Sequence, residues 1–182
     1  IEKIFQTPSG GIHYWSNGNT TEFEGKPALV LLPGLVSDHR LFDKQIEYFK
    51  KFRRVLTWDP PAHGKSYPFK FDFSLADKAA WLDEILKKES INNSVIVGQS
   101  MGGYVGQVYA TLFPNRIKGL IPIDSAQLHG SLANKLETIF LGIVSPLSRI
   151  YPWRAMVNFG SKRVAFSDNG RRLEREMMRA YE

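Results

Sequence analysis

Short apolar runs alternate with helical patterns along the first two thirds of the chain. Two segments, 3–6 and 12–15, predict a hairpin joined at Gly10-Gly11. The continuous apolar run at 28–32 is typical of a strand buried on both faces, and the apolar runs at 54–58, 95–97 and 117–123 predict further strands. Between them, residues at helical spacing predict helices at about 41–49, 75–86 and 105–112. Strands that alternate with helices imply right-handed crossovers and a mainly parallel sheet in an α/β fold.

The pattern changes after Ser125. Helical spacing without any strand pattern predicts three further helices, at 132–144, 147–159 and 168–181. We therefore divide the chain into an α/β core at 1–127 and a helical segment at 128–182.

A Gly-x-Ser-x-Gly motif lies where the third of these apolar runs ends and a helical pattern begins. Gly98, Ser100 and Gly102 are its fixed positions, and strand-turn-helix is the context of a nucleophile elbow. The two glycines allow the close backbone approach of such a turn. Ser100 would then lie at a helix N-terminus, where backbone N–H groups can stabilise an oxyanion. The alternative is a glycine-rich turn that happens to carry an exposed serine.

Two loops extend the pattern. Pro33-Gly34-Leu35 follows the first buried run, and Asp59-Pro60-Pro61-Ala62-His63-Gly64-Lys65-Ser66 follows the second. With the elbow, in this order, they resemble the α/β-hydrolase fold family over residues 1–125. The helical segment from Leu128 resembles the cap, or lid, that family members insert after the sixth strand.

The resemblance implies a mechanism. Ser100 would attack an acyl carbonyl while a histidine, oriented by an acid, takes its proton. The oxyanion would be held by the backbone N–H groups of Met101 and Leu35. The family needs no cofactor for hydrolysis.

The acid and the histidine are the incomplete part of the pattern. The family places them after its seventh and eighth strands, and this chain ends at Glu182 inside the apparent cap. We therefore expect a complementing C-terminal segment, or a homo-oligomer, and an inactive 182-residue piece. Asp124 and His129 are the internal acid and base candidates, although they also suit a loop-capping residue and a polar cap residue.

The composition and the remaining motifs narrow the possible classes of function. Cysteine is absent from the 182 residues, which excludes disulfides and cysteine nucleophiles within them. No metal-ligand spacing, phosphate loop or dinucleotide fingerprint appears, so we expect neither metal nor cofactor. We see no apolar run of ~20 residues for a membrane span and no leader, and we expect a cytoplasmic protein.

Charge adds little. The net charge is +6, and residues 149–182 hold eight basic against four acidic residues. This surplus suits an anionic surface or a solvated helix face, and we expect no nucleic-acid partner.

The leading hypothesis is a serine hydrolase that cleaves an ester of a small or medium apolar acyl compound, or its amide or thioester. Carbon–carbon hydrolysis and perhydrolysis would use the same serine. A non-catalytic receptor on a hydrolase scaffold is the alternative from another class.

Overall fold

The structure is a computed structural model of residues 1–182, and it describes all of them except 19–21, 129–156, 159–160, 162–164, 166 and 180–182. The chain divides into two compact units, Ile1–Ala126 and Gln127–Glu182. Each unit is described by itself.

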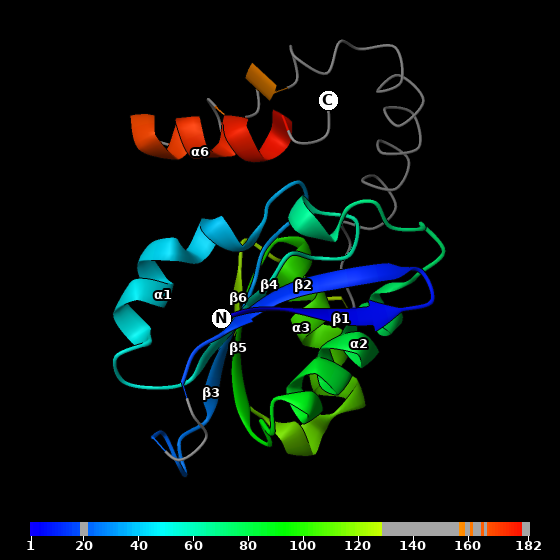
Figure 1. The fold of residues 1–182 in the computed structure, drawn as a ribbon, viewed down its shortest axis with the longest axis vertical. Coiled ribbons are helices and arrows are strands. Elements are labelled where there is room, and N and C mark those ends of the chain that lie inside the picture. Colours follow the sequence, from blue (N-terminus) through cyan, green and yellow to red (C-terminus); the bar gives the residue numbers. More distant parts are fainter. Residues whose placement is uncertain (19–21, 129–156, 159–160, 162–164, 166, 180–182) are drawn as a thin grey trace. The chain divides into compact units, whose positions relative to one another are not determined.

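Six strands of the first unit form one sheet in the order β1-β2-β4-β3-β5-β6 (Figure 1). The strands are β1 (Glu2–Thr7), β2 (Gly10–Ser16), β3 (Ala28–Leu32), β4 (Val55–Trp58), β5 (Ser94–Gln99) and β6 (Ile117–Ile123). β1, β2 and β4 pair antiparallel, whereas β4, β3, β5 and β6 run parallel. The predicted α/β class with a mainly parallel sheet is confirmed.

The hairpin turn differs from the prediction in its position. The turn lies at Pro8 and Ser9, and Gly10 already pairs with Thr7 as the first residue of β2. The Thr7 hydroxyl accepts hydrogen bonds from the amides of Ser9 and Gly10, which closes the turn two residues earlier than the glycine pair suggested.

Three helices connect the strands of the parallel part. They are α1 (Asp43–Phe49), α2 (Leu75–Lys88) and α3 (Met101–Leu112), and short 3₁₀ turns lie at His39–Phe42, Gly64–Ser66 and Pro114–Arg116. α1 covers one face of the sheet, and α2 and α3 cover the other (Figure 1). α2 begins with a capping box, in which Ser74 and Asp77 exchange side-chain and backbone hydrogen bonds.

β3 separates two hydrophobic layers because all of its residues are buried. Leu29 and Leu31 face the cluster that includes Phe42 and the partly buried residues of α1. Val30 and Leu32 face the larger cluster built with α2 and α3. Burying each such side chain contributes about 1.5–3 kcal/mol, so this strand anchors both layers.

β6 is an edge strand among the described residues of the sheet. Pro122 lies inside it and pairs with Gly98, which an edge position tolerates. Ile121 and Ile123 are 50% and 43% exposed. Among the described residues, this edge of the sheet therefore exposes apolar side chains.

The second unit contains α6 (Asp168–Arg179), which confirms the third helix predicted after Ser125. The other two predicted helices fall almost entirely outside the described residues, and the cap assignment of 128–182 stays a prediction. None of the described helices is long and apolar enough to cross a membrane.

A buried ionic network ties α2 to the antiparallel strands. Glu89, 5% exposed at the end of α2, accepts hydrogen bonds from Lys3 (2.7 Å), Tyr14 (2.9 Å) and Arg54 (2.7 Å). Desolvation opposes ionisation of Glu89, but the bonds from Lys3 and Tyr14 and the charge of Arg54 outweigh it and lower its pKa.

We predict that Glu89→Gln lowers the free energy of unfolding by about 3 kcal/mol, because it leaves the Arg54 charge buried without its partner. Glu84→Gln, on the exposed face of the same helix, should cost less than about 1 kcal/mol. Urea titrations of both variants measure the difference.

The pH dependence of stability follows from the lowered pKa of Glu89. A lowered folded-state pKa means that the contribution of Glu89 is complete above its unfolded-chain value of 4.5 and disappears as the pH falls through the folded value. Glu89→Gln should flatten the acid limb of the stability curve. Equal acid limbs would contradict the role of this network.

Candidate active site

Ser100 lies at the tip of a sharp turn between two regular elements. β5 ends at Gln99, α3 begins at Met101, and Ser100 between them has φ 50° and ψ −115°. This left-handed conformation is unfavourable for a residue with a side chain and costs on the order of 1–3 kcal/mol. It places the half-buried Ser100 at the helix N-terminus, where a nucleophile elbow carries its serine.

The two motif glycines are needed for steric reasons. A Cβ atom on Gly98 would clash with the backbone of Gly102 and Gly103, and one on Gly102 would clash with the carbonyl of Leu32. At these two points, β5, α3 and the end of β3 therefore approach one another through backbone atoms. This packing leaves no room for a side chain at Gly98 or Gly102.

The loop after β3 packs against the elbow. The Pro33 carbonyl oxygen also lies within 3 Å of the position of a Gly102 Cβ, and the side-chain amide of Gln99 fills the space beside Gly34. The segments that carry the amides of Met101 and Leu35 are thus neighbours. Leu35 is 61% exposed, and its successor Val36 has φ 54°. The oxyanion roles of Met101 and Leu35 stay predictions.

The segment after β6 holds the elbow from the other side. The Ser100 amide donates to the Ile123 carbonyl at 2.8 Å, and the Ser125 hydroxyl donates to the Ser100 carbonyl at 2.8 Å. Asp124, between these partners, has φ 52° and an exposed side chain. It is the neighbour of both residues that form these hydrogen bonds with Ser100. His129 lies outside the described residues, so the Asp124–His129 pair also stays a prediction.

Backbone strain gathers at this edge of the sheet. Five non-glycine residues in the described part of the chain have positive φ, and four of them follow the carboxyl ends of β3, β4, β5 and β6: Val36, Ala62, Ser100 and Asp124. Strained residues that persist in a fold cluster at functional sites. The carboxyl edge of the parallel strands is therefore the candidate active site.

A second polar group stabilises this edge through Asp59, the buried residue after β4. One carboxylate oxygen accepts from the His39 amide (2.9 Å) and contacts His39 Nδ1 (2.7 Å), and the other accepts from the Lys65 amide (2.8 Å). His39 also stacks on Trp15, with ring centroids 3.7 Å apart. Burial lowers the pKa of His63 in the same loop and favours its neutral form.

One group of side chains at this edge was not predicted from the sequence. Potential ligand atoms of Asp38, His39 and Asp59 lie within 4.8 Å of one another. The carboxylate of Asp38 already binds the Arg40 guanidinium, and that of Asp59 binds the groups named above. These contacts give the group a structural role in joining two loops. Residues 20 positions apart offered no spacing signal for it.

We predict that Gly102→Ala lowers the free energy of unfolding by more than about 2 kcal/mol, because its Cβ meets backbone that cannot move aside. Gly119→Ala in β6 is the matched control, since its Cβ would lie 3.6 Å from the nearest Val95 atom. Thermal unfolding compares them, and equal losses would contradict the clash.

The strain at Ser100 has its own test. Ser100→Gly and Ser100→Ala both remove the hydroxyl, but only glycine accepts φ 50° without strain. We expect Ser100→Gly to be about 1 kcal/mol more stable than Ser100→Ala, after the 0.5–1 kcal/mol entropic cost of glycine. An alanine variant as stable as the glycine variant would argue against a strained elbow.

The chain is similar in sequence to known hydrolases. The (E)-2-((N-methylformamido)methylene)succinate hydrolase of Acinetobacter baylyi is 28% identical over 160 residues, covering 84% of this chain and 59% of that protein. The 3-oxoadipate enol-lactonase 2 of the same organism is 31% identical over 105 residues, covering 56% of this chain and 38% of the lactonase. The chain thus spans little more than half of the first relative's length.

Solved structures show the same fold. An N-acyl homoserine lactonase, AidH, superposes with a TM-score of 0.58 at 26% identity, over 69% of this chain and 45% of its own. A hydrolase from Pseudomonas aeruginosa has a TM-score of 0.68 at 22% identity. The match covers 97% of this chain and 66% of the hydrolase. The family model described as alpha/beta hydrolase fold matches residues 27–150, which include β3, the elbow and β6. The chain belongs to the α/β-hydrolase fold family.

Proposed function

We propose that the protein containing this chain is a serine hydrolase whose nucleophile is Ser100. The observation that carries the proposal is the strained φ of 50° at a serine held between β5 and the N-terminus of α3. The Ser100 hydroxyl attacks the acyl carbonyl and loses its proton to a histidine. The tetrahedral intermediate then expels the alcohol, which takes that proton, and water hydrolyses the resulting acyl-enzyme to release the acid and restore Ser100. The amides of Met101 and Leu35 stabilise the oxyanion of each tetrahedral intermediate.

The substrate class proposed is an ester of a small or medium apolar acyl compound, with amides and thioesters as further members. Two of the similar proteins are named lactonases, and a lactone is a cyclic ester. The exposed Leu35 beside the elbow gives the acyl group an apolar neighbour. The proposed chemistry uses side chains and backbone amides alone, without a cofactor or metal. We also propose that the protein is located in the cytoplasm.

The acid and the histidine of the triad are proposed to lie in the remainder of the longer protein, in line with the 59% of the first relative that the chain spans. A complementing C-terminal segment is the partner this requires, and a homo-oligomer is the second arrangement. Asp124 with His129 is the internal alternative, favoured by the place of Asp124 beside the elbow.

A second candidate function is a ligand-binding protein without turnover. It is favoured by the engagement of His39 and His63, since His39 binds Asp59 and Nδ1 of His63 contacts the Pro61 carbonyl at 2.9 Å. Carbon–carbon hydrolysis and perhydrolysis remain alternatives within the enzymes, because they use the same serine.

The test uses the longer protein, with a fluorophosphonate probe and p-nitrophenyl butyrate as the generic ester. We predict that Ser100→Ala abolishes covalent labelling and lowers ester turnover by about 10⁴–10⁶-fold. Ser9→Ala, in the β1–β2 turn, should leave both unchanged. Labelling at full rate in Ser100→Ala would overturn the nucleophile assignment, and a wild type without labelling or turnover would favour the receptor.

A further inference from the structure

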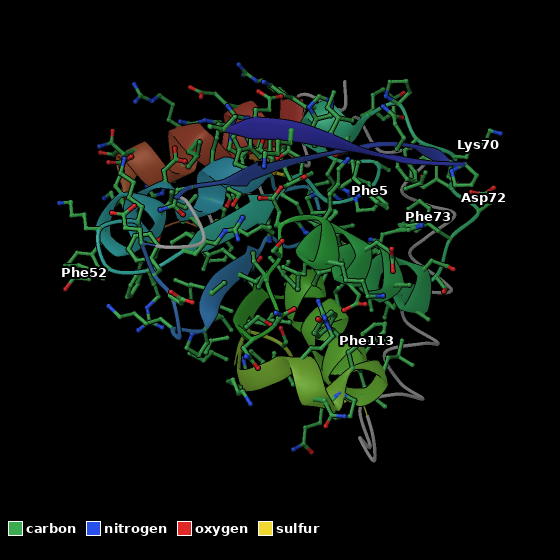
Figure 2. The ribbon with its side chains drawn as sticks, turned by 60° about the horizontal axis from the view of Figure 1, so that its bottom comes forward. Phe5, Phe52, Lys70, Asp72, Phe73 and Phe113 are labelled. Atoms are coloured by element: carbon green, nitrogen blue, oxygen red, sulfur yellow. The ribbon has the colours of Figure 1, made fainter. Side chains whose placement is uncertain are left out.

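Lys78 is a buried cation next to the elbow. It lies in the first turns of α2 and is only 6% exposed. Its ammonium nitrogen lies 3.1 Å from the sulfur of Met101 and 5.2 Å from the ring centroid of Phe73, which is labelled in Figure 2 on the segment leading into α2. Within the described part of the chain, no carboxylate forms an ion pair with it.

These surroundings compensate the charge poorly. A thioether is a weak acceptor, and an aromatic face contributes only about 0.5–2 kcal/mol to binding a cation. The ammonium also lies near the N-terminus of α3, where the helix dipole disfavours positive charge. Lysine is almost never buried unless it is paired. Stability alone therefore does not explain a lysine at this position.

Among the residues that the structure describes, the other titratable groups around Lys78 do not supply a counter-charge. The first turn of α3 contains no acidic residue. His63, from the loop after β4, is buried, and burial lowers its pKa. Asp77, on α2 itself, is held by Ser74 in the capping box. The positive charge at this point of the elbow thus belongs to Lys78.

We propose that Lys78 is a positioning residue that holds Met101 in place and strengthens the oxyanion hole by placing a buried positive charge behind it. This inference rests on the proposed function. Four covalent bonds separate the Met101 amide nitrogen from its sulfur, so the ammonium lies within roughly 8 Å of that amide. In a partly desolvated site, a unit charge at this separation changes the rate by on the order of ten-fold.

The test compares three variants in the longer protein, with p-nitrophenyl butyrate as substrate. Lys78→Met removes the charge and keeps an unbranched apolar side chain, Lys78→Arg keeps a charge, and Lys88→Met is an exposed control on the same helix. We predict that Lys78→Met lowers kcat about ten-fold with little change in KM, while its thermal stability rises because a buried charge is gone. Lys78→Arg should retain more of kcat than Lys78→Met, and Lys88→Met should match the wild type.

The pH profile supplies an independent readout. Burial lowers the pKa of Lys78 from 10.5 to about 8, so the wild-type kcat should fall as the pH rises through about 8. Lys78→Met should lack this alkaline limb. The unfolded chain binds the proton up to 10.5, so wild-type stability should rise between about 8 and 10.5, a rise that Lys78→Met removes.

The outcomes separate the two proposals. If Ser100→Ala is inactive but Lys78→Met keeps the wild-type kcat and pH profile, the Lys78 proposal is wrong and the serine hydrolase stands. If Lys78→Met loses kcat together with stability, the residue is merely structural and the proposal is also overturned. If Ser100→Ala turns over ester as fast as the wild type, the proposed function fails and the role of Lys78 fails with it.

Discussion

The close backbone approach at Gly98 and Gly102 is the constraint on which the candidate site depends. It lets the N-terminus of α3 pass directly over the end of β3, with no side chain between them. Ser100, between the two glycines, has a positive φ, and the loop after β3 lies beside this turn. The proposed nucleophile and the proposed oxyanion donors thus lie beside contacts between main-chain atoms, which are less able to adjust than side chains.

Strained residues and stabilising contacts lie in different parts of the sheet, and this arrangement suits the proposed site. The carboxyl edge carries the strained residues, from Val36 to Asp124, and the polar group around Asp59 holds two of its loops together. The Glu89 network joins the end of α2 to β1, β2 and the start of β4. β3 lies between β4 and β5 in the sheet and is buried along its whole length. A rigid centre of this kind can carry the cost of strain at one edge.

Hydrophobic spacing was a sufficient guide to the elements of the first unit. Every buried strand and each of the three helices that connect them appears where apolar runs and helical spacing indicated. The error at the β1–β2 turn has a local cause, because the Thr7 hydroxyl closes the turn before the glycine pair is reached. The elbow was recognisable because strand, Gly-x-Ser-x-Gly and helix are contiguous. The His39–Asp59 contact was not, because 20 residues and a whole helix separate its members.

By itself, the sequence determined the fold class, the position of the elbow and the identity of its serine, since these depend on local spacing and on glycines at fixed offsets. Only the tertiary structure decided which residues surround that serine. It placed the Leu32 carbonyl against Gly102, tied Ser125 to the Ser100 carbonyl and buried the Lys78 ammonium against Met101. Contacts between distant segments arise from the packing of helices on the sheet, and no periodicity along the chain encodes them.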